Sequence, residues 1–362
     1  MTTTHETPSP RAATAIDAVA DAHVEKYATL DPVSATGMGI ASHDHEMTDF
    51  SPAGYAARAD LARATLAALD GLAPADEIDR VTLAAMRERL GLEVELDEAG
   101  EPQRELNNIA SVVQLRDVFD IMPTGTPDHW SNIAARLNAL PDALGGYVES
   151  LRSSASQGRV AAIRQVEEAI RQADELADPA SSFFTTFVTG PDTDAALDDS
   201  ASCSLVRAEL ERGASAARQA YADLSRFLRD ELAPQAPAAD GVGRERYGLL
   251  SRTFLGATVD LDETYQWGLE ELARVVAEQE AVAAQIAGPG ATVEQAVAVL
   301  DQDPARRLEG TDALRRWMQE TSDAAIAALD GVHFAIAEPL RTLECRIAPT
   351  QNGGIYYTGP SD

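Results

Sequence analysis

Lysine is almost absent from this chain, which has only Lys26 in 362 residues. A mechanism that needs a Schiff-base or phosphate-binding lysine would have to use that one residue, so pyridoxal and phosphate-loop chemistry are disfavoured. Cysteine is also scarce, because Cys203 and Cys345 form neither a Cys-x-x-Cys pair nor a zinc-binding spacing. We therefore expect two buried free thiols in a reducing compartment.

Long apolar runs are missing as well. No stretch approaches the roughly 18 residues that a membrane-spanning helix needs, and the polar N-terminus lacks the hydrophobic core of a signal peptide. Residues 1–10 are expected to form a disordered tail. These absences predict a cytoplasmic protein with no membrane partner.

Several catalytic motifs are absent from the sequence. It contains no His-Glu-x-x-His zinc motif, no Glu-x-x-His pair of a di-iron bundle and no Gly-x-Ser-x-Gly nucleophile elbow. The nearest metal-like run is His43-Asp44-His45-Glu46, whose histidine spacing of two suits a strand or loop. A polar surface loop is favoured over a metal site there. No catalytic or metal-binding residue is therefore predicted in this chain.

Acidic residues dominate the charge, with 59 Asp and Glu against 29 Lys and Arg and a net charge of −30. Such a surface repels phosphate backbones, so nucleic acid is not an expected partner. Aromatic residues make up only 5% of the chain and alanine is abundant, which favours closely packed helices over sheets. The composition predicts a mainly α protein built as a multi-helix array.

Helical periodicity runs through most of the chain, and two helices carry clear apolar stripes. The longest is predicted over 202–232, with a stripe formed by Leu210, Ala214, Ala217, Tyr221, Leu224 and Leu228. A second begins near Asp260, and its apolar face is formed by Tyr265, Leu269, Leu272, Val276, Ala283 and Ile286. Pro141 is expected to break the helix that begins at Thr126-Pro127.

The periodicity changes near the C-terminus. Residues 342–348 alternate polar and apolar side chains, as a half-buried strand does. A turn-forming run at 351–354 then precedes Ile355 to Thr358, which predicts a short β-strand pair. The predicted regions are a tail at 1–10, a helical N-terminal region at 11–237, and a helical region with these first strands at 238–362.

Tyr356 and Tyr357 in the second predicted strand are candidate substrate-binding residues. An exposed edge strand can bind a peptide by main-chain pairing, and a phenol can donate a hydrogen bond to a developing oxyanion. Core packing of the two rings is the alternative role.

Three groups of residues, in their order and spacing, suggest a family. They are Asp31-Pro32-Val33-Ser34-Ala35-Thr36 with Gly39 and His43-Asp44; Tyr247-Gly248 before Thr258-Val259-Asp260-Leu261 and Gly268-Leu269; and Arg346-Ile347-Ala348-Pro349 with Ile355-Tyr356-Tyr357. On these residues the chain resembles the bacterial domain of unknown function 885 family over nearly its whole length.

The resemblance implies a mainly helical, zinc-dependent peptidase with a deep cleft. Members carry a His-Glu-Gly-x-Pro-Gly-His-His motif shortly after the tyrosine strand, and this sequence does not contain it. The resemblance thus implies a truncated chain that supplies cleft walls and first strands, with peptides as partners. Zinc is expected only together with the missing C-terminal part.

Two functions from different classes follow. One is the larger part of a zinc-dependent peptidase, inactive as given. The other is a non-catalytic helical peptide-binding or scaffold protein. A downstream reading frame with the histidine motif favours the first, and chelator-insensitive peptide binding by the isolated chain favours the second.

Overall fold

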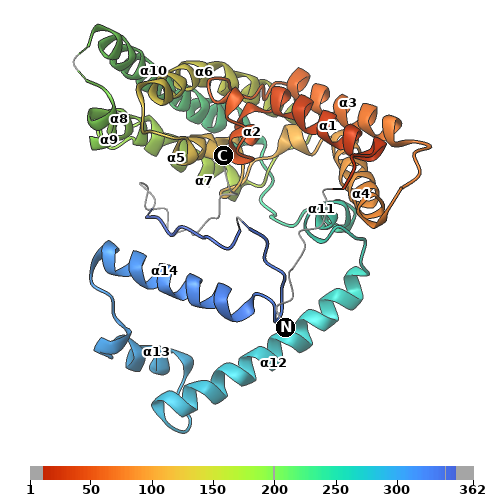
Figure 1. Cartoon of the computed structure of the whole chain (residues 1–362), viewed down its shortest axis with the longest axis vertical. Coiled ribbons are helices and arrows are strands. Elements are labelled where there is room, and N and C mark those ends of the chain that lie inside the picture. Colours follow the sequence, from red (N-terminus) through yellow and green to blue (C-terminus); the bar gives the residue numbers. More distant parts are fainter. Residues whose placement is uncertain (1–10, 199, 339, 348–362) are drawn as a thin grey trace, which may run out of the picture. The chain divides into compact units, whose positions relative to one another are not determined.

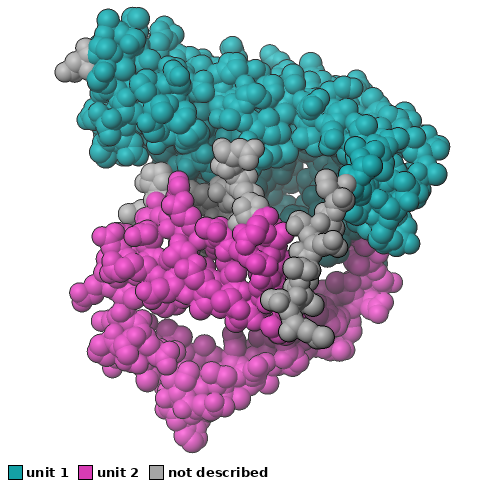
Figure 2. Space-filling view, viewed as in Figure 1, with its two compact units in different colours: residues 1–256, 357–362 teal, residues 257–356 magenta. Residues whose placement is uncertain are grey.

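The computed structural model describes residues 11–198, 200–338 and 340–347, and within them all regular structure is helical (Figure 1). The chain divides into two compact units, whose described parts are residues 11–256 and 257–347 (Figure 2). The division differs from the predicted regions by α11 (Arg244–Leu255), which belongs to unit 1. The expected mainly α fold is confirmed.

Unit 1 is a multi-helix array. Its α-helices are α1 (Ala15–Leu30), α2 (Pro32–Gly37), α3 (Pro52–Leu69), α4 (Glu77–Ala99), α5 (Val118–Ile121), α6 (Pro127–Ser156), α7 (Ile163–Ala177), α8 (Phe183–Val188), α9 (Pro191–Ala196), α10 (Ala201–Phe227) and α11. The starts of α3 and α6 follow the sequence, because Ser51 and Thr126 accept hydrogen bonds from the N–H groups of Gly54 and His129 and a proline follows each cap.

The core of unit 1 lies around α6 and α10, which pack against each other along their length. The predicted stripe of α10 is confirmed, since Leu210, Tyr221, Leu224 and their stripe neighbours are all buried. The close approach of the two helices depends on Gly213, where an added Cβ would lie 2.7 Å from the Cβ of Leu137.

Pro141 does not break its helix. α6 runs through it without interruption, contrary to the expectation from sequence. Proline in a helix interior costs about 3 kcal/mol, but Leu137, Leu140 and Leu144 around it are all buried in the unit 1 core. Burial of this apolar face outweighs the lost backbone hydrogen bond.

Unit 2 contains α12 (Leu261–Ala287), α13 (Val293–Asp301) and α14 (Gly310–Leu329). Capping residues in the sequence again mark the helix starts. Asp260 caps α12, and Thr292 forms a capping box with Gln295 at the start of α13. α13 packs on the C-terminal part of α12, where Ala283 is buried.

The first strand of the predicted C-terminal pair is not a strand in the structure, since the described residues 342–347 are irregular. A strand needs a neighbouring backbone, and here the side-chain amide of Gln319 on α14 takes that place. Its Nε2 donates to Leu343 O at 2.7 Å, and Cys345 N donates to its Oε1 at 2.9 Å. The second predicted strand, 355–358, lies outside the described residues. The predicted strand pair and deep cleft are not confirmed.

Candidate functional site

The two predicted substrate-binding residues, Tyr356 and Tyr357, lie outside the described residues, so their role stays a prediction. The two cysteines are free and buried, as expected. Cys345 lies 3.6 Å from the hydroxyl of Ser322 on α14. Neither thiol lies in a cluster of metal-binding side chains within the described parts of the chain.

The run from His43 to Glu46 forms a short loop in which both histidines face one carboxylate. Nδ1 of His43 and Nε2 of His45 each lie 3.4 Å from Oε1 of Glu46. Asp44 is directed elsewhere, because it is buried and accepts a hydrogen bond from Thr36 Oγ1 at 2.7 Å. In the described ranges no group of three His, Cys, Asp or Glu residues could hold a metal ion, so these residues do not fit the zinc that the resemblance implies.

Arg136 on α6 fixes this loop. Its guanidinium is fully buried and donates to the backbone carbonyls of Pro32, His43 and Glu46 and to Thr36 Oγ1, at 2.8 to 3.2 Å. Burial, opposed by the nearby carboxylates, lowers its pKa to about 10, which leaves the guanidinium charged at neutral pH. The first of the three groups of residues that resemble the family, from Asp31 to Asp44, therefore has a structural role, because Arg136 and Asp31 hold this segment in place.

Asp31 also holds the segment from Pro32 to Glu46 in place. It caps α2 by accepting from Ser34 N at 3.1 Å, and it accepts from the Thr48 hydroxyl at 2.6 Å. Tyr27 OH on α1 donates to the same carboxylate at 3.3 Å. Burial, reinforced by the Asp31 carboxylate, raises the pKa of Tyr27 to about 12.

A polar cluster near Asp31 is the best candidate for a binding site in unit 1. It consists of Tyr55 and Arg58 on α3, Glu93 on α4 and Tyr147 on α6. The Arg58 guanidinium lies 4.7 Å from the centre of the Tyr55 ring and donates to Asp49 O at 2.9 Å. Residues from three helices converge here, and burial raises the pKa of both tyrosines and of Glu93.

Both phenols of this cluster are protonated at neutral pH, because burial raises their pKa. Tyr147 OH donates to the backbone oxygen of Glu105 at 2.5 Å, so this hydroxyl has a structural partner. Within the described part of the chain, neither the Tyr55 hydroxyl nor the Glu93 carboxyl forms a hydrogen bond with another residue, and both side chains are half-buried. Ionisable groups whose pKa is shifted by burial and that retain hydrogen-bonding capacity mark candidate functional sites.

Sequence reasoning missed this cluster. Its members are spread over more than 90 positions, and only Tyr55 and Arg58 are neighbours on one helix, three residues apart. Tyr and Arg at such a spacing occur on many solvated helix faces. No signal in a single sequence links them to Glu93 and Tyr147.

A small cavity of about 250 Å³ lies elsewhere in unit 1, lined by residues that include Arg152, Phe227 and Glu231. Arg152 binds Glu231 through two hydrogen bonds of 2.9 Å and lies 5.0 Å from the centre of the Phe227 ring. Because the charges of Arg152 and Glu231 neutralise each other, this cavity offers a ligand fewer free polar groups than the Tyr55 cluster does.

A set of ion pairs positions α11, the last helix of unit 1. Arg246 binds Glu101 at 2.9 Å, and Arg252 binds Glu88 and Glu95 on α4 at 3.1 and 2.7 Å. α11 has no buried side chain, so these charges, rather than apolar packing, attach it. Such pairs are sensitive to salt.

No helix of the described residues is both long and apolar enough to span a bilayer. No match was found among curated proteins. Among solved structures, the chain is similar to the crystal structure described as the putative lipoprotein from Colwellia psychrerythraea, with a TM-score of 0.69 and 16% sequence identity. The similarity covers 88% of this chain and 59% of that one, so this chain corresponds to less than two thirds of the neighbour.

The family of bacterial proteins of unknown function DUF885 matches residues 32–362. The match begins at Pro32, within the segment that Arg136 and Asp31 tie together, and it includes both compact units. It agrees with the resemblance seen in the sequence. The chain belongs to the DUF885 family.

Proposed function

We propose that this chain forms the larger, helical part of a zinc-dependent peptidase and is inactive without further polypeptide. One finding supports the partial character: the chain corresponds to 59% of its structural neighbour. The peptidase chemistry comes from the resemblance, in which the zinc ligands and the glutamate base belong to a motif that this sequence lacks. No catalytic step is assigned to residues of this chain.

The experiment compares the 362-residue chain with the protein purified from its native source. Zinc per chain is measured by elemental mass spectrometry, and hydrolysis of a quenched fluorescent peptide library is followed with and without chelator. The proposal predicts no bound zinc and no chelator-sensitive hydrolysis for the chain alone, and both properties for a native form with additional polypeptide. Stoichiometric zinc on the chain alone contradicts it, as does a larger native protein with neither zinc nor hydrolysis.

A second candidate is a non-catalytic helical protein that binds peptides or acts as a scaffold. The Tyr55 cluster favours it, since the half-buried Tyr55 phenol and Glu93 carboxyl and the buried Arg58 guanidinium provide a hydrogen-bond donor and both charge signs. The discriminating measurement is peptide binding to the isolated chain by fluorescence anisotropy. Binding that chelator does not change, and that Arg58→Met weakens at least tenfold, favours this candidate.

The cellular location is a further proposal. The cytoplasm is the location expected from the sequence, whereas the Colwellia psychrerythraea neighbour is described as a putative lipoprotein, which applies to that protein. Fractionation of native cells with an antibody against the chain decides between them. The protein is expected with the cytoplasmic fraction, and recovery with membranes or periplasm contradicts this location.

A further inference from the structure

Unit 2 has almost no core of its own. Among its described residues only three are buried: Ala283, Ala296 and Cys345. Large apolar side chains are exposed throughout it, and Figure 2 shows an opening through the unit. A compact unit of this length normally buries well over half of its surface. Unit 2 therefore has the helices of a domain without the packing that makes a domain stable.

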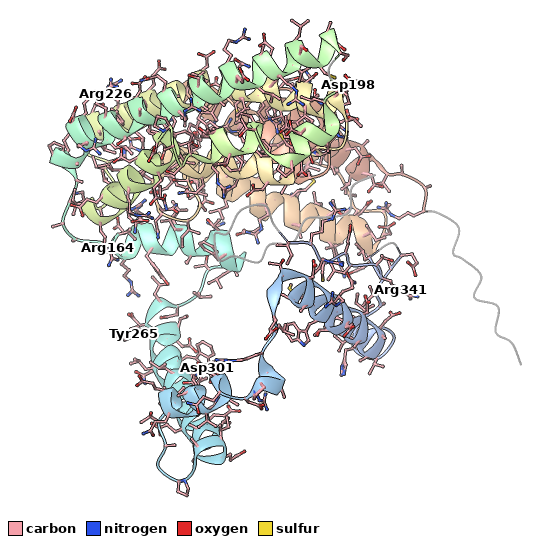
Figure 3. All side chains as sticks on the ribbon, turned by 90° about the vertical axis from the view of Figure 1, so that its left-hand side faces the viewer. Arg164, Asp198, Arg226, Tyr265, Asp301 and Arg341 are labelled. Carbon is pink, nitrogen blue, oxygen red and sulfur yellow. The ribbon has the colours of Figure 1, made fainter. Side chains whose placement is uncertain are left out.

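The apolar face of α12 is the clearest part of this exposed surface. Tyr265, Leu269, Leu272 and Val276 follow helical steps of three and four, and their exposed fractions are 70%, 46%, 60% and 41%. We call these four residues the α12 stripe; Tyr265 at its start is marked in Figure 3. A stripe of this spacing is the side by which a helix packs onto a neighbour.

The other side of α12 is suited to water. Arg274 binds Glu271 and Glu278 there through hydrogen bonds of 2.6 to 3.0 Å, in the (i, i+3) and (i, i+4) positions of a solvated face. The helix is thus amphipathic, and the described residues of unit 2 leave the stripe on its apolar side uncovered. Isolated helices draw little stability from their own hydrogen bonds, so α12 needs a partner along the stripe.

We propose that the α12 stripe is the docking surface for the polypeptide that completes this fold, namely the part that corresponds to the uncovered 41% of the Colwellia psychrerythraea neighbour. The neighbour has the same fold over 88% of this chain, and 41% of the neighbour is polypeptide that this chain does not match. Apolar side chains are required on that polypeptide to cover Leu269 and Leu272, because the stripe carries no charge. A second copy of this chain and short substrate peptides are the competing occupants.

The inference deepens the proposed function, since it names the partner that an incomplete peptidase requires, but it does not depend on zinc. If the native protein lacks zinc and activity while the stripe is covered by this polypeptide, the peptidase proposal fails and the docking inference stands. If the 362-residue chain alone binds zinc and hydrolyses peptides, the peptidase proposal must be revised. The cross-linking result then decides the docking inference separately.

The test uses site-specific photo-cross-linking in native cells. A photoreactive amino acid replaces Leu272 in the stripe, or Ala281, which is exposed on the opposite side of the same helix and serves as the matched control. Cross-linked peptides are identified by mass spectrometry. We expect position 272 to cross-link to polypeptide outside residues 1–362 whose sequence aligns with the remaining part of the neighbour, at a yield at least tenfold above position 281.

Four results overturn the inference: cross-links from position 272 to a second copy of the chain, to residues of the same chain, to assorted short peptides, or equal yields at both positions. Isotope-mixed protein separates the first two, because only a second copy gives cross-links between differently labelled chains. A Leu272→Glu variant adds an independent readout. It is expected to lower co-purification of the completing polypeptide at least tenfold, whereas Ala281→Glu leaves it unchanged, and equal effects contradict the inference.

Discussion

At the scale of single residues, the buried Arg136 is the main tie between α6 and the segment from Pro32 to Glu46. It is held by uncharged oxygens: three backbone carbonyls and one hydroxyl. Removing the guanidinium takes one donor away from each of these acceptors, which is a costly kind of core change. The sequence did not reveal this role, because nothing in it distinguishes Arg136 from Arg152, the exposed arginine of the same helix.

We therefore expect Arg136→Met to lower the free energy of unfolding of unit 1 by about 3 kcal/mol or more. The measurement is urea unfolding followed by the fluorescence of the buried Trp130 in unit 1, in a background with the other two tryptophans replaced. Arg152→Met is the control on the same helix, because its partner Glu231 is exposed and such pairs contribute at most about 1 kcal/mol. Equal losses for the two variants would show that Arg136 is not a structural tie.

Glu93 gives a prediction for pH. Burial raises the pKa of its carboxyl above the ordinary value of 4.5, so the folded protein binds this proton more tightly than the unfolded chain does. The stabilisation of the folded protein by this tighter proton binding is fully present below about pH 4.5. It is lost as the pH rises through the pKa of Glu93 in the folded state. Glu93→Gln should therefore melt at a higher temperature than the parent at pH 8, and the gap should close toward pH 4.

The check is a series of thermal melts between pH 4 and 8. Glu98→Gln on the exposed side of the same helix controls for the change in net charge. A Glu93→Gln variant that is less stable than the parent at pH 8 would mean that attraction to Arg58 outweighs the cost of burial. The Tyr55 cluster would then be an ion-pair network rather than a binding site.

At the scale of elements, helix starts were the easiest features to predict. Thr126 and Asp260 each cap the helix expected after them, because capping is a local interaction within one turn. The continuity of α6 through Pro141 could not be predicted, since it depends on packing against α10. The strand expected at 342–348 is not formed over its described residues, 342–347, for a similar reason: alternation sets the faces of a strand but supplies no partner to pair with.

The packing of α6 on α10 gives a matched pair of glycine substitutions. Gly213→Ala places a Cβ 2.7 Å from that of Leu137, so the helices must move apart, and overpacking of this kind costs about 1–3 kcal/mol. Gly145→Ala on α6 meets no atom within 4 Å and should be neutral or stabilise by up to about 1 kcal/mol through helix propensity. Urea unfolding measures both. If both substitutions changed the free energy of unfolding in the same direction, the close contact at Gly213 would be contradicted.

At the scale of the whole molecule, the two units differ in how they are stabilised. The α10 stripe and the α12 stripe look alike in the sequence, and both predict a packed face. In the structure the first is buried in the unit 1 core and the second is exposed. Periodicity identifies the apolar face of a helix but not whether its partner lies in the same chain. The candidate site shows the same limit, because Tyr55, Arg58 and Glu93 meet only through the tertiary fold.

Unit 1 contains a large buried core, whereas unit 2 lacks the packing to be stable by itself. Amide hydrogen exchange of the purified 362-residue chain, read by mass spectrometry, tests this difference most directly. We expect amides of α6 and α10 to remain protected for hours, and those of α12 and α14 to exchange within seconds to minutes at every protein concentration. Protection of α12 equal to that of α10 in the monomeric chain would contradict the claim.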